Sequence, residues 1–192
     1  MLSICDLAGV IRKITSRRST AIVSALRGYS APVDLAMPMP APALAALVTA
    51  DDDAFTRWWA SEELMIGVID AHRAGRPSEA DAVLAPLVGA LRHAIRHETD
   101  LALLAQLLAP DEFMLGDREP RIDVDGVAAG LAHLRREVGN ALHDDLLALL
   151  ATRAGDDPAG IGPGDIAARM LVEPVLGYLL ATGSAADRKS VV

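Results

Sequence analysis

Two histidines four residues apart are the first candidates for chemistry in this sequence. His93 and His97 would lie on one face of a helix, a spacing at which two imidazoles can bind one metal ion. A zinc peptidase helix also needs a glutamate directly after the first histidine of the pair, and Ala94 stands there. A glutamate follows His97, but Leu101 occupies the position of the second histidine. We therefore expect no metal site, and both histidines on a solvent-exposed helix face.

The remaining nucleophiles and potential ligands form no recognisable catalytic arrangement. Cys5 has no evident histidine partner, and no serine lies in the Gly-x-Ser-x-Gly turn of hydrolases. The glycine-rich loop over residues 160–164 lacks the lysine of a phosphate-binding loop. The other histidines are scattered along expected helices: His72, His133 and His143. The sequence predicts no catalytic residue, no cofactor-binding residue and no metal ligand in this chain.

One carboxylate lies within an apolar helix stripe. Glu62 belongs to the same stripe as Phe55 and Trp59, and a buried carboxylate needs a partner. Arg57 is poorly placed to be that partner, because it lies five residues away on the same helix. We therefore expect an arginine from another helix or domain. Trp58 and Trp59 could form a binding platform, but their helical spacing favours positions in the core and at an interface.

The composition favours helices packed on helices. Hydrophobic residues make up 52% of the 192 residues but aromatic residues only 3%, so alanine, leucine and valine must supply most of the core. The net charge of −8 argues against a nucleic-acid or anionic-membrane binder, although residues 1–28 hold five basic side chains and one acidic one. A single cysteine excludes a disulfide framework. Without a signal peptide or a long apolar run, we expect a cytoplasmic protein.

The apolar periodicity predicts five or six helices joined by short loops. Residues 1–28 show a weak helical pattern, and four prolines between residues 32 and 42 predict an extended connector. Stripes and capping residues then predict helices over residues 55–74, 84–95, 101–108, 127–149 and 165–181. Short loops favour antiparallel neighbours. The expected fold class is all-α, with antiparallel helix pairs in a right-handed superhelical stack like those of ARM and HEAT repeats, preceded by the extended connector.

Four segments resemble, in order, the C-terminal part of bacterial aminopeptidase N, a zinc-dependent gluzincin. Leu26–Val33, with the sequence LRGYSAPV, resembles the family segment that leads from a small β-domain into the C-terminal helical domain. Asp53–Ala60 is similar to the start of that domain's first helix. Leu107–Glu112 and Leu134–Leu147 resemble two later segments. The residue types in Leu26–Val33 agree with this resemblance, since Gly28 permits a tight bend where the chain leaves one domain for the next.

The resemblance implies a role without catalysis. The family's zinc ligands, substrate-binding loop and catalytic tyrosine lie in an upstream domain, and no segment of this chain matches them. We therefore expect no enzymatic activity from this chain on its own and no cofactor in it, with zinc bound in the full-length family enzyme. The implied partners are the catalytic and β-domains of an aminopeptidase N, in cis or from a separate chain, with no nucleic acid and no membrane. The residues singled out for interdomain or packing contacts are Arg27, Gly28, Tyr29, Pro32, Phe55, Arg57, Trp58, Trp59 and Glu62.

The expected organisation has four parts: an atypical basic leader over 1–25, an extended proline-rich connector over 26–42, a partial C-terminal helical domain over 43–183, and a tail over 184–192. The family domain continues with further helices after Ala181, so we expect exposed apolar faces and possible self-association. In the full enzyme this domain would cover the active-site cavity and restrict peptide access. The alternatives are a free-standing helical protein-interaction scaffold and a degraded gene fragment without activity.

Overall fold

A two-stranded antiparallel hairpin precedes the helices. The computed structural model describes residues 12–15, 21–25, 27–29, 38–111, 123–153 and 160–182. Strand β1 (Arg12–Thr15) pairs with β2 (Ala21–Ser24), with Arg12 opposite Ser24. The helical pattern predicted for residues 1–28 is therefore wrong at both strands. Each strand contains two β-branched residues among its four, and this local preference outweighs a weak apolar periodicity.

The helical domain starts within the segment predicted as a connector. Helix α1 (Ala41–Ala50) follows Pro40 and has Pro42 in its first turn. Proline is well tolerated there, because the first N–H groups of a helix have no partner within the helix. The proline-rich segment therefore runs directly into a helix that the sequence did not predict. Pro32 lies outside the described residues.

Two long helices follow α1: α2 (Ala54–Arg73) and α3 (Pro77–His97). Asp53 caps α2 by accepting a 2.8 Å hydrogen bond from the N–H of Thr56. Gly75, with φ of 66°, ends the pair's connecting turn in the left-handed conformation that glycine adopts without strain. Helix α3 continues through Pro86 and begins seven residues before the predicted start, again with a proline in its first turn.

Three further helices complete the described fold: α4 (Leu101–Leu108), α6 (Val124–Arg153) and α7 (Pro163–Thr182). Neither Gly139 in α6 nor Pro174 in α7 ends its helix. Gly139 allows close packing instead, because a β-carbon there would lie 2.5 Å from the main-chain oxygen of Tyr178 on α7. Glycine at this position therefore sets how closely α6 and α7 approach each other.

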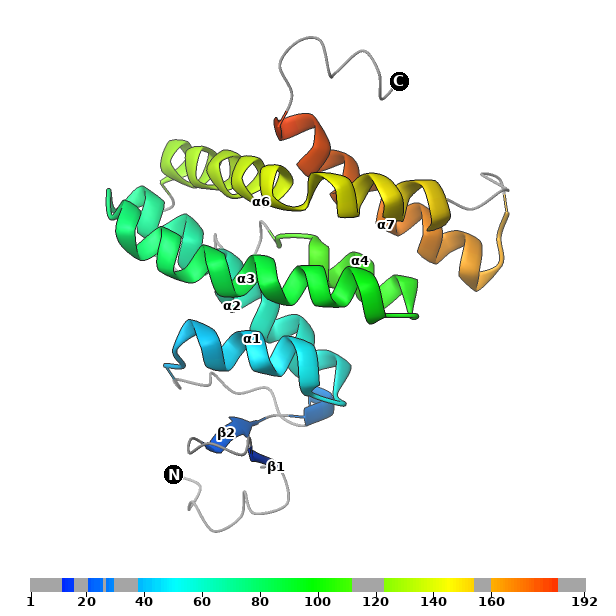
Figure 1. Ribbon diagram of the computed structural model, residues 1–192, viewed down its shortest axis with the longest axis horizontal. Helices are drawn as coiled ribbons and strands as arrows, with labels where there is room; N and C mark the ends of the chain where they lie inside the picture. Colours follow the sequence, from blue (N-terminus) through cyan, green and yellow to red (C-terminus); the bar gives the residue numbers. More distant parts are fainter. Residues whose placement is uncertain are drawn as a thin grey trace.

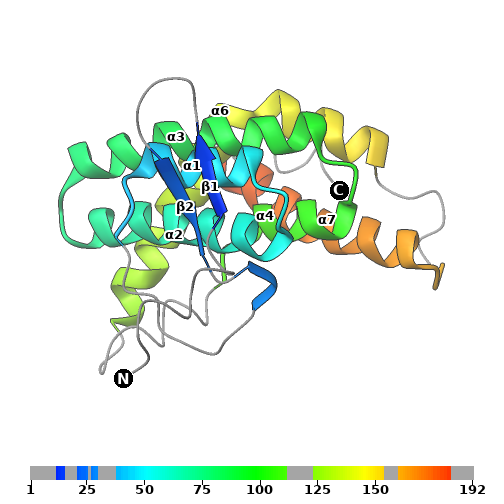
Figure 2. The ribbon, with the colours of Figure 1, turned by 90° about the horizontal axis from the view of Figure 1, so that it is seen from below.

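The helices stack in layers around one hydrophobic core. Figure 1 shows α1 above the hairpin, α2 and α3 in the next layer, and α6 with α7 at the top. Seen from below, α1 lies in front of α2 and α3, and the strands of the hairpin run across it (Figure 2). Fully buried side chains come from every layer, among them Leu47, Leu64, Leu87, Leu104, Leu134 and Tyr178. The predicted stack of helix pairs is confirmed for the described helices, and the hairpin stands before it.

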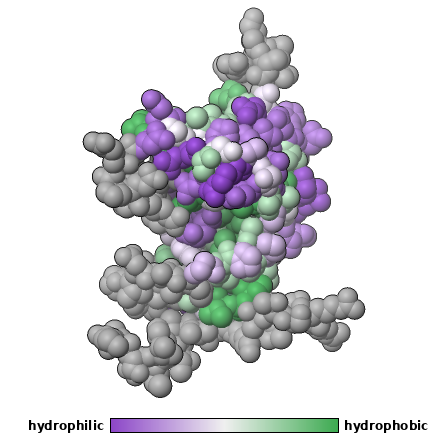
Figure 3. Space-filling model, turned by 90° about the vertical axis from the view of Figure 1, so that its left-hand side faces the viewer, coloured by the Kyte–Doolittle hydropathy of each residue, from purple (hydrophilic) through white to green (hydrophobic). Residues whose placement is uncertain are grey.

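The end of the α2–α3 pair is mainly hydrophilic. Figure 3 looks onto the left-hand side of Figure 1, where the α2–α3 turn and the start of α6 lie. Hydrophilic side chains predominate over the upper part of this face, and apolar ones gather lower down. Exposed charged side chains at these elements include Arg76, Glu79, Asp123 and Asp125. This end of the helical stack therefore presents mainly charged side chains to solvent.

Candidate functional site

The segment after the hairpin docks on the loop between α1 and α2. A short 3-10 turn, η2 (Arg27–Tyr29), follows strand β2. The guanidinium group of Arg27 donates a 2.9 Å hydrogen bond to Asp51 Oδ1 and also pairs with Asp52. The hydrogen bond to Asp52, together with the charges of the neighbouring aspartates, raises the pKa of Arg27 above its ordinary value. Arg27 therefore stays charged and holds the turn on an acidic loop.

A single carboxylate joins this turn to the first turn of α2. The N–H of Gly28 donates to Asp53 Oδ2 over 2.8 Å, while Asp53 Oδ1 accepts from the N–H and the hydroxyl of Thr56. Gly28 has a φ of 62°, which a side-chain-bearing residue rarely adopts. The bend expected at Gly28 is therefore present, and its amide faces the helix cap.

The end of β2 contributes to the same network. The hydroxyl of Ser24 is buried and lies 3.4 Å from both the Thr56 hydroxyl and Nη1 of Arg27. Asp51 Oδ1 additionally accepts a 2.8 Å hydrogen bond from the N–H of Asp53. Sequence reasoning identified the aspartates only as helix caps and missed Ser24. Three consecutive acidic residues stand before this helix, Asp51, Asp52 and Asp53. Such a cluster of negative charge favours a basic partner, and this signal could have predicted the contact with Arg27.

Arg57 joins three helices at the same end of the molecule. Its Nε donates to the main-chain oxygen of Val48 on α1 over 2.9 Å, and its Nη1 lies 2.5 Å from Oε2 of Glu98, the residue that follows α3. Burial raises the pKa of Glu98, but hydrogen bonds from the N–H of Asp100 and from Arg57 outweigh it, so the net pKa lies below its usual value. Arg57 therefore has partners on α1 and after α3.

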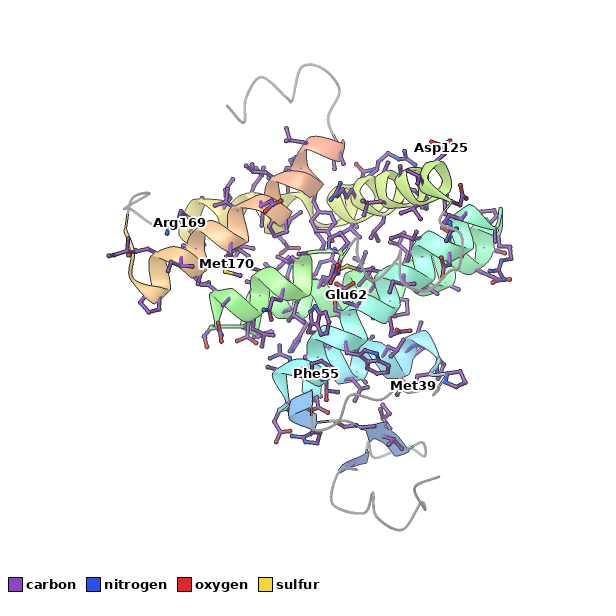
Figure 4. All side chains as sticks on the ribbon, turned by 180° about the vertical axis from the view of Figure 1, so that it is seen from behind. Met39, Phe55, Glu62, Asp125, Arg169 and Met170 are labelled. Carbon is purple, nitrogen blue, oxygen red and sulfur yellow. The ribbon has the colours of Figure 1, made fainter. Side chains whose placement is uncertain are left out.

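The aromatic residues of the predicted set lie at the start of α2. The rings of Phe55 and Trp58 are tilted, with centroids 5.5 Å apart, and Phe55 is labelled in Figure 4. Trp59 packs against the hydrophobic core and lines a small cavity of about 200 Å³ together with Met39 and Val83. The side chain of Tyr29 lies outside the described residues. An interdomain role for these aromatic residues stays a prediction.

Glu62 lies in the middle of the helical stack, with only 2% of its surface exposed (Figure 4). Its Oε2 accepts a 3.1 Å hydrogen bond from the N–H of Asp111, just beyond the end of α4. The adjacent Ser61 donates its hydroxyl to the main-chain oxygen of Leu107 over 2.9 Å. A main-chain amide is thus one partner of Glu62, and the predicted arginine partner stays a prediction.

Tyr178 closes this polar cluster from the side of α7. Its hydroxyl donates a 2.8 Å hydrogen bond to the main-chain oxygen of Leu108. The last carbonyl groups of a helix have no partner within that helix, so Ser61 and Tyr178 together satisfy two buried carbonyls of α4. Complete burial, and then the charge of Glu62, raise the pKa of Tyr178. The phenol therefore remains a donor at all physiological pH values.

Two grooves run along α7. One has a volume of about 580 Å³ and lies between α4, α6 and α7, with Asp111, Arg135 and Glu173 among its lining residues. The other, of about 710 Å³, is mainly apolar and lies between α6 and α7. Arg135 and Gly177 line both grooves. Among the described residues that line these grooves there is no histidine, cysteine or serine.

Four of the five histidines lie in two pairs of neighbouring rings. His93 and His97 are exposed on α3, with ring centroids 4.5 Å apart, as expected for a solvated face. His72 on α2 and His133 on α6 stack with centroids 4.2 Å apart, a contact between helices that the sequence did not predict. Among the residues that the structure describes, no three His, Cys, Asp or Glu side chains are grouped so that they could hold a metal ion. No described helix is both long and apolar enough to span a membrane.

Comparison with known proteins identifies the family. The family model described as a domain of unknown function, DUF3458_C, with ARM repeats matches residues 41–192. No curated protein matches the sequence. The crystal structure of Legionella pneumophila aminopeptidase A in complex with aspartic acid is similar over 90% of this chain, with a TM-score of 0.73 and 20% sequence identity. The match covers 21% of that aminopeptidase chain, in its C-terminal part. This chain belongs to the DUF3458_C family of ARM-repeat domains.

Proposed function

We propose that this chain is the non-catalytic C-terminal helical domain of a zinc metallo-aminopeptidase of the aminopeptidase N type. In that setting it covers the active-site cavity and restricts the access of peptides. The observation that carries the proposal is the likeness in fold between nearly the whole chain and one part of an aminopeptidase. The segment Leu26–Val33, which resembles the entry into this domain, supports it independently.

The contribution of such a domain is steric and electrostatic. A wall of packed helices excludes water and bulky substrates from a cavity without supplying a base or a nucleophile. In the family that this chain resembles, zinc is bound in an upstream catalytic domain, and the proposal places it there in the full enzyme. The network of Arg27, Asp51 and Asp53 holds the η2 turn on the helical domain, which suits a wall that must keep its position.

The test combines the purified chain with an aminopeptidase N from which the helical domain has been removed. Hydrolysis of an alanine anilide and of a longer peptide is measured with and without the chain. We expect the chain alone to release no amino acid, to bind the truncated enzyme, and to lower turnover of the long peptide more than that of the anilide. Zinc-dependent turnover by the chain alone would contradict the proposal, as would unchanged selectivity of a truncated enzyme that binds it.

A matched pair of variants makes the test specific to the junction, by which we mean the contacts of Arg27 and Gly28 with Asp51, Asp52 and Asp53. Arg27→Ala removes the ion pairs with Asp51 and Asp52, whereas Arg76→Ala removes an exposed pair with Glu79 at the far end of α2. If the junction orients the domain, Arg27→Ala weakens the effect on selectivity and Arg76→Ala leaves it as in the unmodified chain. Equal effects of both variants would argue against this orienting role.

A free-standing protein-interaction scaffold is the second candidate. It is favoured by large apolar side chains exposed on and next to α6 and α7: Leu147, Ile161, Ile166, Met170 and Leu180. Such surface favours self-association or binding to another protein. Light scattering and a binding assay with the truncated aminopeptidase separate the two functions. A stable complex with the enzyme favours the first, and a defined self-assembly without enzyme binding favours the second.

A further inference from the structure

Two imidazole rings stack where α2 and α6 cross. The rings of His72 and His133 are nearly parallel, at an interplanar angle of 12°, with centroids 4.2 Å apart. Both side chains are half-buried. A stack of this kind is favourable between neutral rings, but two positive charges at this separation repel each other.

A hydrogen bond determines which nitrogen of His133 carries the proton. Nη2 of Arg136 lies 3.1 Å from Nδ1 of His133. A guanidinium group can only donate, so Nδ1 is the acceptor and the ring is neutral, with its proton on Nε2. Glu137 Oε1 is 3.8 Å from the same nitrogen and accepts from Nε of Arg136 over 3.2 Å. Protonation of Nδ1 would therefore break the bond from Arg136 before a pair with Glu137 could form.

The backbones of the two helices are held close one turn before the stack. A β-carbon at Gly130 would lie 2.8 Å from Cγ2 and 3.1 Å from the main-chain oxygen of Ile69. Gly130 precedes His133 by three residues, and Ile69 precedes His72 by three. A further contact at the crossing is the ion pair of Arg73 and Asp123, in which Nη2 and Oδ2 are 3.7 Å apart. The close approach of the helices here keeps the two rings within stacking distance, so a change in the spacing of α6 and α2 would change the stack.

We propose that the His72–His133 stack is a pH-sensitive contact, which holds α6 on α2 while the ring of His133 is neutral and loosens when that ring is protonated. This inference is independent of the proposed aminopeptidase role. It assigns a function to two histidines that take part neither in the contacts of Arg27 with the aspartates nor in the buried cluster of Glu62 and Tyr178.

The charges around His133 come from several elements. Asp81 on α3 and Glu137 on α6 favour its protonated form, whereas His72 on α2 and Arg136 on α6 oppose it. The part of α7 beside this stretch of α6 contributes apolar residues, Leu180 and Ala181, to the neighbouring groove. Burial, and then the charge of His72, lower the pKa of His133 below its ordinary value of 6.5.

The direction of the pH effect follows from this lowered pKa. Below about pH 6.5 the unfolded chain takes up a proton at His133 that the folded chain does not. The contribution of this histidine to stability is therefore complete at neutral pH. It declines as the pH falls from about 6.5 toward the pKa of the folded state.

The experiment compares thermal unfolding of the full chain at about pH 7.5 and about pH 5.8. The variants are His133→Phe, which keeps a flat ring that cannot be protonated, and His143→Gln, a control on the same helix whose imidazole faces Asp144 near the surface. We expect a drop in Tm on acidification that is at least halved in His133→Phe and unchanged in His143→Gln. An equal drop in all three proteins overturns the proposal.

A second measurement holds even if His133→Phe folds poorly. The C2 proton of His133 is followed by NMR through a pH titration of the full chain and of His72→Gln. If the rings are coupled, the apparent pKa of His133 rises toward the ordinary value once His72 is replaced. Identical titration curves in the two proteins overturn the coupling.

Discussion

The hydroxyl of Tyr178 donates a 2.8 Å hydrogen bond to the main-chain oxygen of Leu108 and so ties α7 to the end of α4. Both groups are buried at the centre of the stack, next to Glu62. Tyr178 and Leu108 are 70 positions apart in the sequence. The bond thus ties the last described helix, α7, to the end of α4 through one side chain.

Replacing Tyr178 with phenylalanine tests this link. The ring stays in place, but the carbonyl of Leu108 loses its partner in a buried position. We expect the free energy of unfolding to fall by about 1–3 kcal/mol, measured by urea denaturation. Thr152→Val is the control, because the Thr152 hydroxyl is exposed and bonds only within its own helix, at Ala148 and Leu149. A loss for Tyr178→Phe no larger than that of the control would contradict the role given to this bond.

Arg57→Ala removes the connection between α1, α2 and the residue after α3. The variant loses the bond to the Val48 oxygen and leaves the largely buried Glu98 carboxylate without its guanidinium partner. We expect a loss of about 1–3 kcal/mol in unfolding free energy. Arg57→Lys should recover only part of it, since an ammonium group cannot reach both acceptors with a planar fork. Full recovery by lysine would show that charge alone, and not geometry, matters at this position.

Two glycines make a direct test of helix packing. Gly130→Ala places a methyl group 2.8 Å from Ile69 Cγ2 and 3.1 Å from the main chain of α2. We expect it to destabilise the protein by about 1–3 kcal/mol. Gly89→Ala on α3 meets no atom within 4 Å and should stabilise the protein by about 0.5–1 kcal/mol through helix propensity. The two melting curves should therefore shift in opposite directions, and a shift in the same direction would refute the close approach.

Asp145 contributes to the way in which the free energy of unfolding falls at acidic pH. Burial raises the pKa of Asp145, but hydrogen bonds from Arg96 and Arg92 on α3 outweigh it and the net pKa is lowered. A carboxyl with a lower pKa in the folded state stabilises the protein above its ordinary pKa of about 4, and this contribution is lost as the pH falls through the folded value. We expect Asp145→Asn to be less stable at neutral pH and to lose less stability between about pH 7 and about pH 3.5. Parallel pH profiles for the two proteins would contradict this.

Local signals were sufficient for much of the helical framework. Asp53 and Asp100 cap the helices that follow them, and the apolar stripes of α2, α4 and α6 place these helices correctly. Prolines misled the prediction in α1 and α3, since Pro42 and Pro77 lie in first turns, where a proline costs no hydrogen bond. In the hairpin, four-residue strands are too short for periodicity to be decisive.

The contacts of the candidate site could be predicted only in part. The sequence singled out Arg27, Gly28 and Arg57, and the structure gives each of them partners, but those partners depend on how the chain folds back. Arg57 and Glu98 are 41 residues apart, and His72 and His133 are 61 apart with no shared motif. Such pairs are set by the crossing of whole helices, a property that no local pattern contains.

The two oxygens of Asp53 have a consequence for how this protein unfolds. One oxygen completes the first turn of α2 and the other holds the amide of Gly28, so neither part can be released without disturbing the other. We therefore expect the turn at Gly28 and the first turn of α2 to lose their structure together, as one cooperative unit. In native-state hydrogen exchange, the amides of Gly28 and Thr56 are expected to open with a common free energy. In the Asp53→Ala variant, the two amides are expected to open with different free energies.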